Sequence, residues 1–205
     1  MLVLHYDTET TGFVQKSLPL HDPRQCKIVQ FGAILDDTDK PEKEREQMRL
    51  DCIVALKGGV PADAARIHGI TTEKSQQIGV SETNAMNIFL DMVEVADIIV
   101  GQNIIDFDNV VVTANARRIL GENFHDFEPF KGKEFFDTMV SAKPICRIPG
   151  KQGGFKKPNL TEIHKHFFGE GFDKAHSAIN DVLAARRCYY AMQDLMQKTE
   201  AKEPA

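Results

Sequence analysis

Two carboxylates near the amino terminus constrain this chain more than any other feature, because they stand two residues apart after an apolar run. Residues 2–6 (LVLHY) predict a short buried β-strand, and Asp7 and Glu9 follow it. In an extended chain, residues i and i+2 point to the same side, so the two side chains converge. Such a pair either stays solvated or shares a hard divalent cation, which takes oxygen ligands. Gly12 then allows the backbone to approach a ligand closely.

Two further polar clusters lie downstream, over residues 103–108 (NIIDFD) and 176–181 (HSAIND). Together with residues 7–12 (DTETTG), they resemble the three motifs of the DEDDh exonucleases. This DnaQ-like family includes the proofreading subunit of bacterial DNA polymerase III. The motifs stand in the family's order, and the resemblance covers roughly residues 1 to 195.

The resemblance implies a ribonuclease-H-like fold of the α/β class, with a mixed central β-sheet flanked by α-helices. It also implies 3′→5′ hydrolysis of phosphodiester bonds, with release of nucleoside monophosphates. Two Mg²⁺ or Mn²⁺ ions would stabilise the charge that develops in this reaction. By resemblance, Asp7 would bridge both ions, and Glu9, Asp108 and Asp181 would complete their ligand shells.

His176 lies just before the last predicted helix, and Asp181 falls within the first turns of that helix. An imidazole titrates near neutral pH and suits a general base that takes a proton from water. The family assigns this role to the matching histidine. A polar surface residue near a helix start is the alternative for His176 alone. Ala178 is small enough to let the helix start pack closely.

The middle motif departs from the family pattern. Gln102 stands where many members have histidine, and Asp108 follows Asn103 by five residues where four is more common. Asp106 is therefore a rival ligand. Residues two positions apart on a helix point to roughly opposite faces, so the carboxylates of Asp106 and Asp108 cannot both reach one ion. We assign Asp108 as the ligand because residues 107–108 match the family's aromatic–Asp pair, and we expect Asp106 to be the N-cap.

Eight residues are candidate substrate contacts: Thr10, Thr11, Gly12, Phe13, His68, Asn103, Lys151 and Lys156. By resemblance, backbone groups over residues 10–13 contact the terminal nucleotide, and Phe13 wedges against its base. Core packing is the alternative for Phe13. Residues 67–71 resemble a recurrent family segment near the substrate, although a turn that closes a short helix explains Gly69 equally well.

Charge is unevenly distributed along the chain. The formal net charge is -5, which is unusual for a protein that binds nucleic acid. Residues 141–158, however, hold five lysines or arginines and no acid, with Phe155 among them. Such a segment either tracks a phosphate backbone or forms a solvated loop rich in glycine and proline.

The hydrophobic pattern predicts strands over residues 2–6, 28–35, 50–56 and 98–100. Close spacing of the first three favours antiparallel pairing, with polar connections over 8–26 and 36–48. Helices are expected over 62–68, from an N-cap at Ser81 to about 96, over 107–120, over 160–168 and from about 177 onward; residues 135–140 fit either a strand or a short helix. This order indicates an α/β or α+β domain with a mixed sheet.

The 205 residues favour one exonuclease domain over 1–197, with a flexible tail over 198–205. No apolar run approaches the length of a membrane span, and the first strand leaves no room for a signal peptide, so we expect a cytoplasmic protein without membrane contact. The four cysteines form no C-x-x-C pair, which favours reduced thiols.

The expected activity is a metal-dependent 3′→5′ exonuclease that acts on single-stranded or frayed 3′ ends, of DNA rather than RNA. An exoribonuclease or oligoribonuclease is the alternative within the class. A non-catalytic nucleic-acid-binding subunit that kept the fold is the alternative outside it, although all five catalytic positions hold competent residues. A polymerase or another replication or repair protein is a candidate partner.

Overall fold

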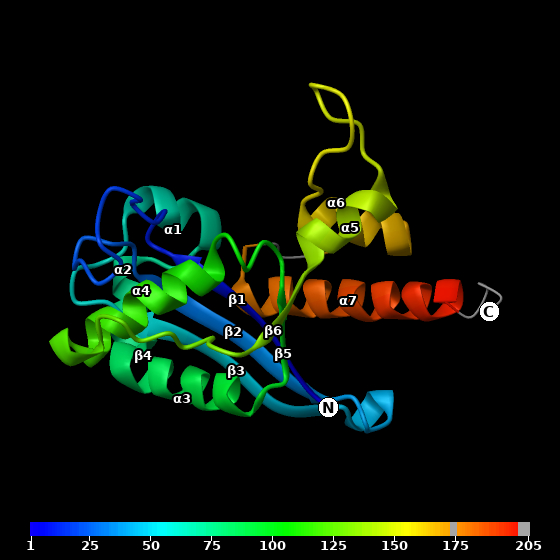
Figure 1. Cartoon of the computed structure of the whole chain (residues 1–205). Helices are drawn as coiled ribbons and strands as arrows, with labels where there is room; N and C mark the ends of the chain where they lie inside the picture. The colour runs from blue at the N-terminus through cyan, green and yellow to red at the C-terminus, as the bar shows by residue number, and fades with distance from the viewer. Residues whose placement is uncertain (173–175, 201–205) are drawn as a thin grey trace.

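A computed structural model describes residues 1–172 and 176–200 (Figure 1). Within these residues, one mixed sheet runs in the order β4-β3-β2-β1-β5-β6. Its strands are β1 (Leu2–Thr10), β2 (Ile28–Asp37), β3 (Glu46–Ala55), β4 (Val80–Ser81), β5 (Ile98–Gly101) and β6 (Glu134–Asp137). The β1-β2-β3 segment is antiparallel, as predicted, whereas β5 lies parallel to β1, β6 to β5 and β4 to β3.

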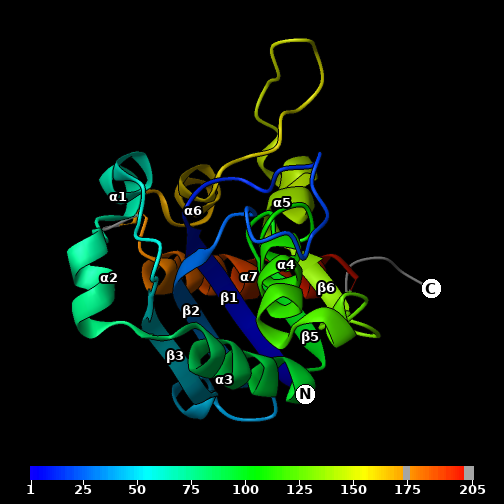
Figure 2. The same cartoon turned by 90° about the vertical axis from the view of Figure 1, so that its left-hand side faces the viewer.

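Helices cover both faces of this sheet. They are α1 (Ala62–His68), α2 (Thr72–Ile78), α3 (Glu82–Val95), α4 (Asp108–Leu120), α5 (Thr138–Cys146), α6 (Leu160–Phe168) and α7 (Ala178–Glu200). Helices α3 and α4 pack on one face, and α7 crosses the other with α5 and α6 against it (Figures 1 and 2). Short 3-10 helices occupy Glu42–Glu44 and Glu122–Phe124.

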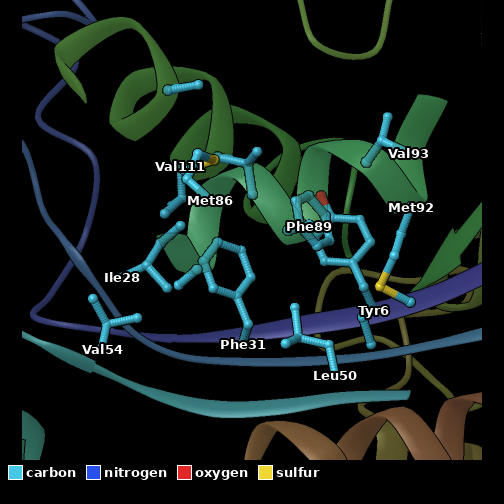
Figure 3. Close-up of a cluster of buried hydrophobic side chains, with 14 of the residues drawn as sticks. Tyr6, Ile28, Phe31, Leu50, Val54, Met86, Phe89, Met92, Val93 and Val111 are labelled. Carbon is cyan, nitrogen blue, oxygen red and sulfur yellow. The ribbon is translucent and has the colours of Figure 1, made fainter. Parts of the chain in front are cut away.

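Alternation along β1 explains why its first residues are apolar on both faces. Leu4 and Tyr6 belong to the core under α3 and α4, where the Tyr6 ring lies 4.8 Å from the ring of Phe89 (Figure 3). Val3 and His5 point the other way, toward Tyr189 of α7. A strand buried on both sides needs no polar alternation, so it appears in the sequence as a continuous apolar run.

The predicted elements are largely confirmed, but two predicted connections were too long. β1 continues through Thr10, so residues 8–10 are strand rather than loop. The solvated connection expected over 36–48 is shorter, because β2 runs through Asp37 and β3 begins at Glu46. Residues 135–140, for which the sequence allowed a strand or a short helix, contain the end of β6 and the start of α5.

Helix caps follow the sequence closely in two places. The Ser81 side chain accepts a hydrogen bond from the Asn84 backbone N–H, as the predicted N-cap of α3 requires. Gly69 takes the left-handed conformation (φ +72°) that ends α1. On α3, Met86 and Val93 pack in the core, whereas Ile88 is 39% exposed.

Helix α7 runs through Glu200, and residues 201–205 lie outside the described part of the chain. The domain boundary at 197 therefore stays a prediction. All four cysteines are free thiols, in agreement with the sequence. None of the described helices is both long enough and apolar enough to cross a membrane.

A buried ionic network holds α7 on the sheet. The Asp36 carboxylate of β2 accepts hydrogen bonds from Arg186 Nε and Nη2 (2.7 and 2.8 Å) and from the Tyr190 hydroxyl (2.7 Å). His5 Nε2 lies 3.3 Å from the same carboxylate. Burial alone would raise the pKa of Asp36, but the nearby His5 and the hydrogen bonds from Arg186 lower it to about 2.

Close backbone packing fixes the start of α7. A Cβ atom at Gly32 of β2 would lie 2.4 Å from the carbonyl carbon of Ala178 and 2.5 Å from the backbone nitrogen of Ile179. Only a glycine leaves room for this approach. The sequence predicted that Ala178 lets the helix start pack closely, but it did not reveal the partner in β2.

We predict that Gly32→Ala destabilises the protein by about 1–3 kcal/mol, because the added methyl meets backbone atoms that cannot move independently. Chemical denaturation would measure the free energy of unfolding. Gly171→Ala is the matched control, since its Cβ would meet Thr161 Cγ2 at an ordinary 3.5 Å and Lys165 Cε at 3.7 Å. An equal stability of the two variants would contradict this account of the α7 contact.

Candidate active site

Three carboxylates from two ends of the chain meet at the α7 face of the sheet. Asp7 and Glu9 extend from β1 on this face, and Asp181 extends from the first turn of α7. One oxygen from each of the three lies within 4.8 Å of the others. An all-oxygen, half-buried group of this kind is the donor set that hard divalent cations take.

The electrostatics of the cluster also fit a cation. Desolvation raises the pKa of Asp7 well above its usual value, and the charges of Asp108, Asp181 and Glu9 raise it further. Desolvation, followed by Asp181 and Asp108, raises the pKa of Glu9 to about 7. Desolvation raises the pKa of Asp181 to about 6, against the opposing effect of the His176 backbone N–H. Positive charge bound among these groups would restore their ionised forms.

Asp108 joins this cluster from its edge. It is the first residue of α4, is buried, and its Oδ1 accepts hydrogen bonds from the Thr8 backbone N–H (3.1 Å) and hydroxyl (2.6 Å). Desolvation raises its pKa to about 7, although the Thr8 hydrogen bonds oppose this rise. Its own charge contributes to the raised pKa of both Asp7 and Glu9.

Asp106, the rival ligand, lies elsewhere. Its side chain is exposed and forms an ion pair with Lys157, 3.3 Å away. The expectation that Asp106 caps α4 was wrong: Phe107 occupies the N-cap position, and no side chain caps the helix there. The helix starts one residue later than expected, which places Asp108 at its first position.

His176 stands on the approach to α7 with a positive φ of 69°. Its backbone N–H donates to Asp181 Oδ2 at 3.1 Å, and its side chain is exposed. Residues 173–175, which precede it, lie outside the described residues. The Ala178 N–H donates to Gln30 Oε1 of β2 at 3.3 Å, so a second residue of this strand, besides Gly32, positions the lead-in to α7.

The candidate contacts that follow β1 form a short polar turn. The Thr10 hydroxyl donates to the Gly12 carbonyl (2.7 Å), and Thr11 and Lys27 exchange two hydrogen bonds. Phe13 is 84% exposed and meets Phe107 edge-on at 6.0 Å between ring centroids. Core packing, the alternative for Phe13, is therefore wrong.

His68 comes close to the same turn from the end of α1. Its Nδ1 accepts the Ile70 backbone N–H at 3.1 Å. Burial lowers the pKa of His68, the Thr10 backbone opposes this effect, and the nearby His176 lowers the pKa further. His68 thus lies between the turn after β1 and the lead-in to α7.

Asn103 shapes the loop between β5 and α4. It takes the left-handed conformation (φ 60°), and its N–H donates to Asp137 Oδ1 at 3.1 Å. Asp137 also caps α5 by accepting the backbone N–H groups of Met139 and Val140. The role of Asp137 was not predicted, although an aspartate just before a helix start is a recognisable N-cap signal. Gln102, the departure from the family, donates to the Pro158 carbonyl at 3.0 Å.

Residues 147–158 of the basic segment form a hairpin that projects beyond α5 and α6 (Figure 1), whereas residues 141–146 belong to α5. Pro149 and Phe155 pair across it. At its base, Lys156 forms an ion pair with Glu162, and Lys157 pairs with Asp106. Lys156 is therefore engaged within the protein, whereas Lys151 lies exposed on the hairpin.

Similarity to known proteins places this geometry in a family. A family model described as "Exonuclease" (RNase_T) matches residues 4–189. The chain belongs to this exonuclease family. The three motifs predicted this membership, and the match confirms it. No curated protein sequence matches the chain.

Solved structures of exonuclease I share the fold. The complex of the E. coli enzyme with a dT13 oligonucleotide is 20% identical, with a TM-score of 0.66 over 94% of this chain and 40% of that chain. An apo exonuclease I is 18% identical (TM-score 0.68; 94% and 42%), and a zinc-bound E. coli complex with single-stranded DNA is 19% identical (TM-score 0.64; 98% and 41%). The chain thus spans about two fifths of these enzymes, and the likeness confirms the ribonuclease-H-like fold.

We predict that the metal-free protein loses stability as pH rises from about 5 to 8. Carboxyl pKa values near 6–7 in the folded state, against about 4 in the unfolded state, mean that the folded state binds more protons across this window, so each pH increase favours unfolding. Asp7→Asn removes one repelling charge. In EDTA at pH 8 it should raise the melting temperature by about 2–4 °C, and at pH 5 the gain should shrink.

Thermal unfolding followed by circular dichroism would measure both effects. Asp106→Asn, which changes an exposed carboxylate outside the cluster, is the control and should show no pH-dependent gain. A lower melting temperature for Asp7→Asn at pH 8 would mean that repulsion in the cluster is not a source of instability.

Proposed function

We propose that this protein is a metal-dependent 3′→5′ exonuclease that removes nucleoside monophosphates from single-stranded DNA. The observation that carries the proposal is the convergence of Asp7, Glu9 and Asp181, with Asp108 beside them, from three separate motifs. Membership of the exonuclease family supports the reaction class. The motif resemblance supports the 3′→5′ direction, and the neighbours solved with dT13 and dA16 support DNA as the substrate.

The four carboxylates are the proposed ligands of two Mg²⁺ or Mn²⁺ ions. Their oxygen donors suit these hard cations, and the desolvation that raises their pKa values makes the ionised carboxylates costly unless a cation is bound among them. When bound, such ions supply positive charge to the oxygens of the phosphodiester and to the attacking water.

The chain's own residues then orient the reactants. His176 is the proposed general base: its ring is exposed, and its backbone N–H is held by Asp181 of the cluster. The turn over residues 10–12 offers backbone groups to the terminal nucleotide, and Phe13 offers an exposed ring to its base. His68 and Asn103 border this turn and the middle motif, and Lys151 provides a cation on the projecting hairpin.

The first test uses 5′-labelled single-stranded DNA and RNA in parallel, with Mg²⁺ and with EDTA. We expect a ladder that shortens one nucleotide at a time on DNA and disappears in EDTA. Asp108→Asn should reduce the rate at least about 100-fold, on the order of the loss when a group that stabilises transition-state charge is removed. Asp106→Asn, its matched control two residues away, should cut at close to the normal rate.

Faster shortening of RNA would favour the exoribonuclease alternative. An inactive wild-type protein that still binds the strand would favour the non-catalytic subunit. A loss in Asp106→Asn with normal activity in Asp108→Asn would overturn the assignment of the middle motif. Asp181→Ala, which should abolish cleavage and leave the fold intact, checks the third motif in the same assay.

His176→Ala should lower kcat by about 10²- to 10⁴-fold, the usual contribution of a general base, and leave the affinity for the strand nearly unchanged. Single-turnover rates and fluorescence anisotropy would separate the two quantities. His166→Ala is the control, because His166 lies on α6 outside the carboxylate cluster. Normal turnover with weakened binding in His176→Ala would show that this side chain binds substrate and moves no proton.

A further inference from the structure

A pocket opens beside the turn that follows β1, between this turn and the connection from β3 to α1. Its volume is about 570 Å³. Its lining includes Thr11 from the loop after β1, Lys27 and Lys57, and Gly58 with Thr72. In Figure 1, this region lies around α1 and α2, at the end of the sheet away from the N-terminus.

The pocket carries uncompensated positive charge. Its lining in the described residues contains no aspartate or glutamate. Arg24, also in the lining, is neutralised by a hydrogen-bonded pair with Asp22 at 2.7–2.9 Å. Neither Lys27 nor Lys57 forms an ion pair within residues 1–172 and 176–200. In a chain of net charge -5, two unpaired ammonium groups in an acid-free pocket mark a place for an anion.

The backbone around the lysines leaves room for a ligand. A Cβ atom at Gly58 would lie 3.9 Å from Lys27 Nζ, so this ammonium stands over a residue that has no side chain. Gly59 has a φ of +75°, and a Cβ there would come within 3.0 Å of Thr72 Oγ1. Because these two consecutive glycines have no side chains, the space beside the ammonium of Lys27 stays open.

The pocket is also tied to the carboxylate site through Thr11. The Thr11 N–H donates to the Lys27 carbonyl at 2.9 Å, and the Lys27 N–H donates to Thr11 Oγ1 at 2.8 Å. Thr11 stands two residues after Glu9, so these hydrogen bonds fix the Lys27 backbone to the turn that follows the first two carboxylates. A strand whose end occupies the carboxylate site would have its other phosphates within reach of this wall.

We propose that this pocket binds phosphate groups of the nucleic-acid strand outside the carboxylate site, with Lys27 and Lys57 as the charged contacts. The inference rests on the proposed function for the identity of the strand, but its chemistry is that of a phosphate. The pocket supplies the attraction that the acidic site cannot supply before metal binds. Affinity and cleavage therefore depend on different residues.

The test measures binding of a 5′-fluorescein dT12 strand by anisotropy in EDTA, over a series of salt concentrations. Lys27→Gln/Lys57→Gln should raise the Kd roughly 10-fold at low salt. It should also reduce the slope of log affinity against log salt by about 1.4, because each phosphate of a single strand that a lysine neutralises contributes about 0.7. Lys27→Arg/Lys57→Arg, which keeps both charges, should restore binding. Lys40→Gln/Lys43→Gln, on the turn near the N-terminus, is the matched control and should bind normally.

The phosphate bound in the pocket could be an internal phosphate of the strand or a phosphate at its 3′ end. Binding of strands that end in a 3′-hydroxyl or a 3′-phosphate distinguishes the two. Equal losses of affinity on both strands support contact with internal phosphates. A loss of affinity confined to the 3′-phosphate strand would overturn that placement, because it would mean that the pocket binds the phosphate at the 3′ end of the strand. An unchanged Kd and slope on both strands, or an equal loss in the control pair, would overturn the proposal as a whole.

Hydrolysis of the p-nitrophenyl ester of thymidine 5′-phosphate tests the proposed function independently of strand binding in the pocket. This ester has a single phosphate, so the lysine variants should cleave it at the normal rate. If the protein cleaves neither the ester nor the strand but its binding of the strand depends on the two lysines, the phosphate-binding proposal would be supported and the proposed nuclease function contradicted.

Discussion

The removal of four carboxylates from water into one partly buried cluster is the constraint on which the rest of this structure depends. Asp7, Glu9, Asp108 and Asp181 each have a pKa raised by desolvation, and like charges add to the rise for Asp7 and Glu9. No local propensity would bring such groups together, so tertiary packing must hold them. The strand that carries two of them is accordingly buried on both faces, and the helices that deliver the other two begin at the cluster.

Contacts of helix α7 offset the free-energy cost of bringing the carboxylates together. Arg186 and Tyr190 bind the buried Asp36 on the same helix that presents Asp181, and Gly32 lets its first turn contact β2 directly. Buried ion pairs are often close to neutral in net stability, but they are expensive to break and therefore select one arrangement. Here the network fixes the position of α7 over the sheet, and with it the place of the third motif's carboxylate.

The sequence could predict what depends on local pattern, and it failed where distant residues decide. Each of the features that were predicted correctly could be recognised from residues close together in the sequence. They are the strand periodicity, the Ser81 cap and the carboxylates within each motif. The roles of Gly32 and Gln30, and the contact of Asp137 with Asn103, depend on partners 34 to 148 positions away, which no single motif reveals. The misplaced cap at Asp106 has the same origin, because its carboxylate pairs with Lys157, 51 residues along the chain.

The distribution of charge, rather than its total, decides what this surface can bind. Without a cation, the carboxylate cluster repels a phosphate, so an incoming strand must first be attracted elsewhere. Two groups of cations stand apart from the cluster: the projecting hairpin with Lys151, and the pocket with Lys27 and Lys57. Attraction at these places and charge compensation at the carboxylates are thus physically separate. A net charge of -5 is compatible with nucleic-acid binding because screening limits each charge to its own surroundings, within about 10 Å at ordinary salt.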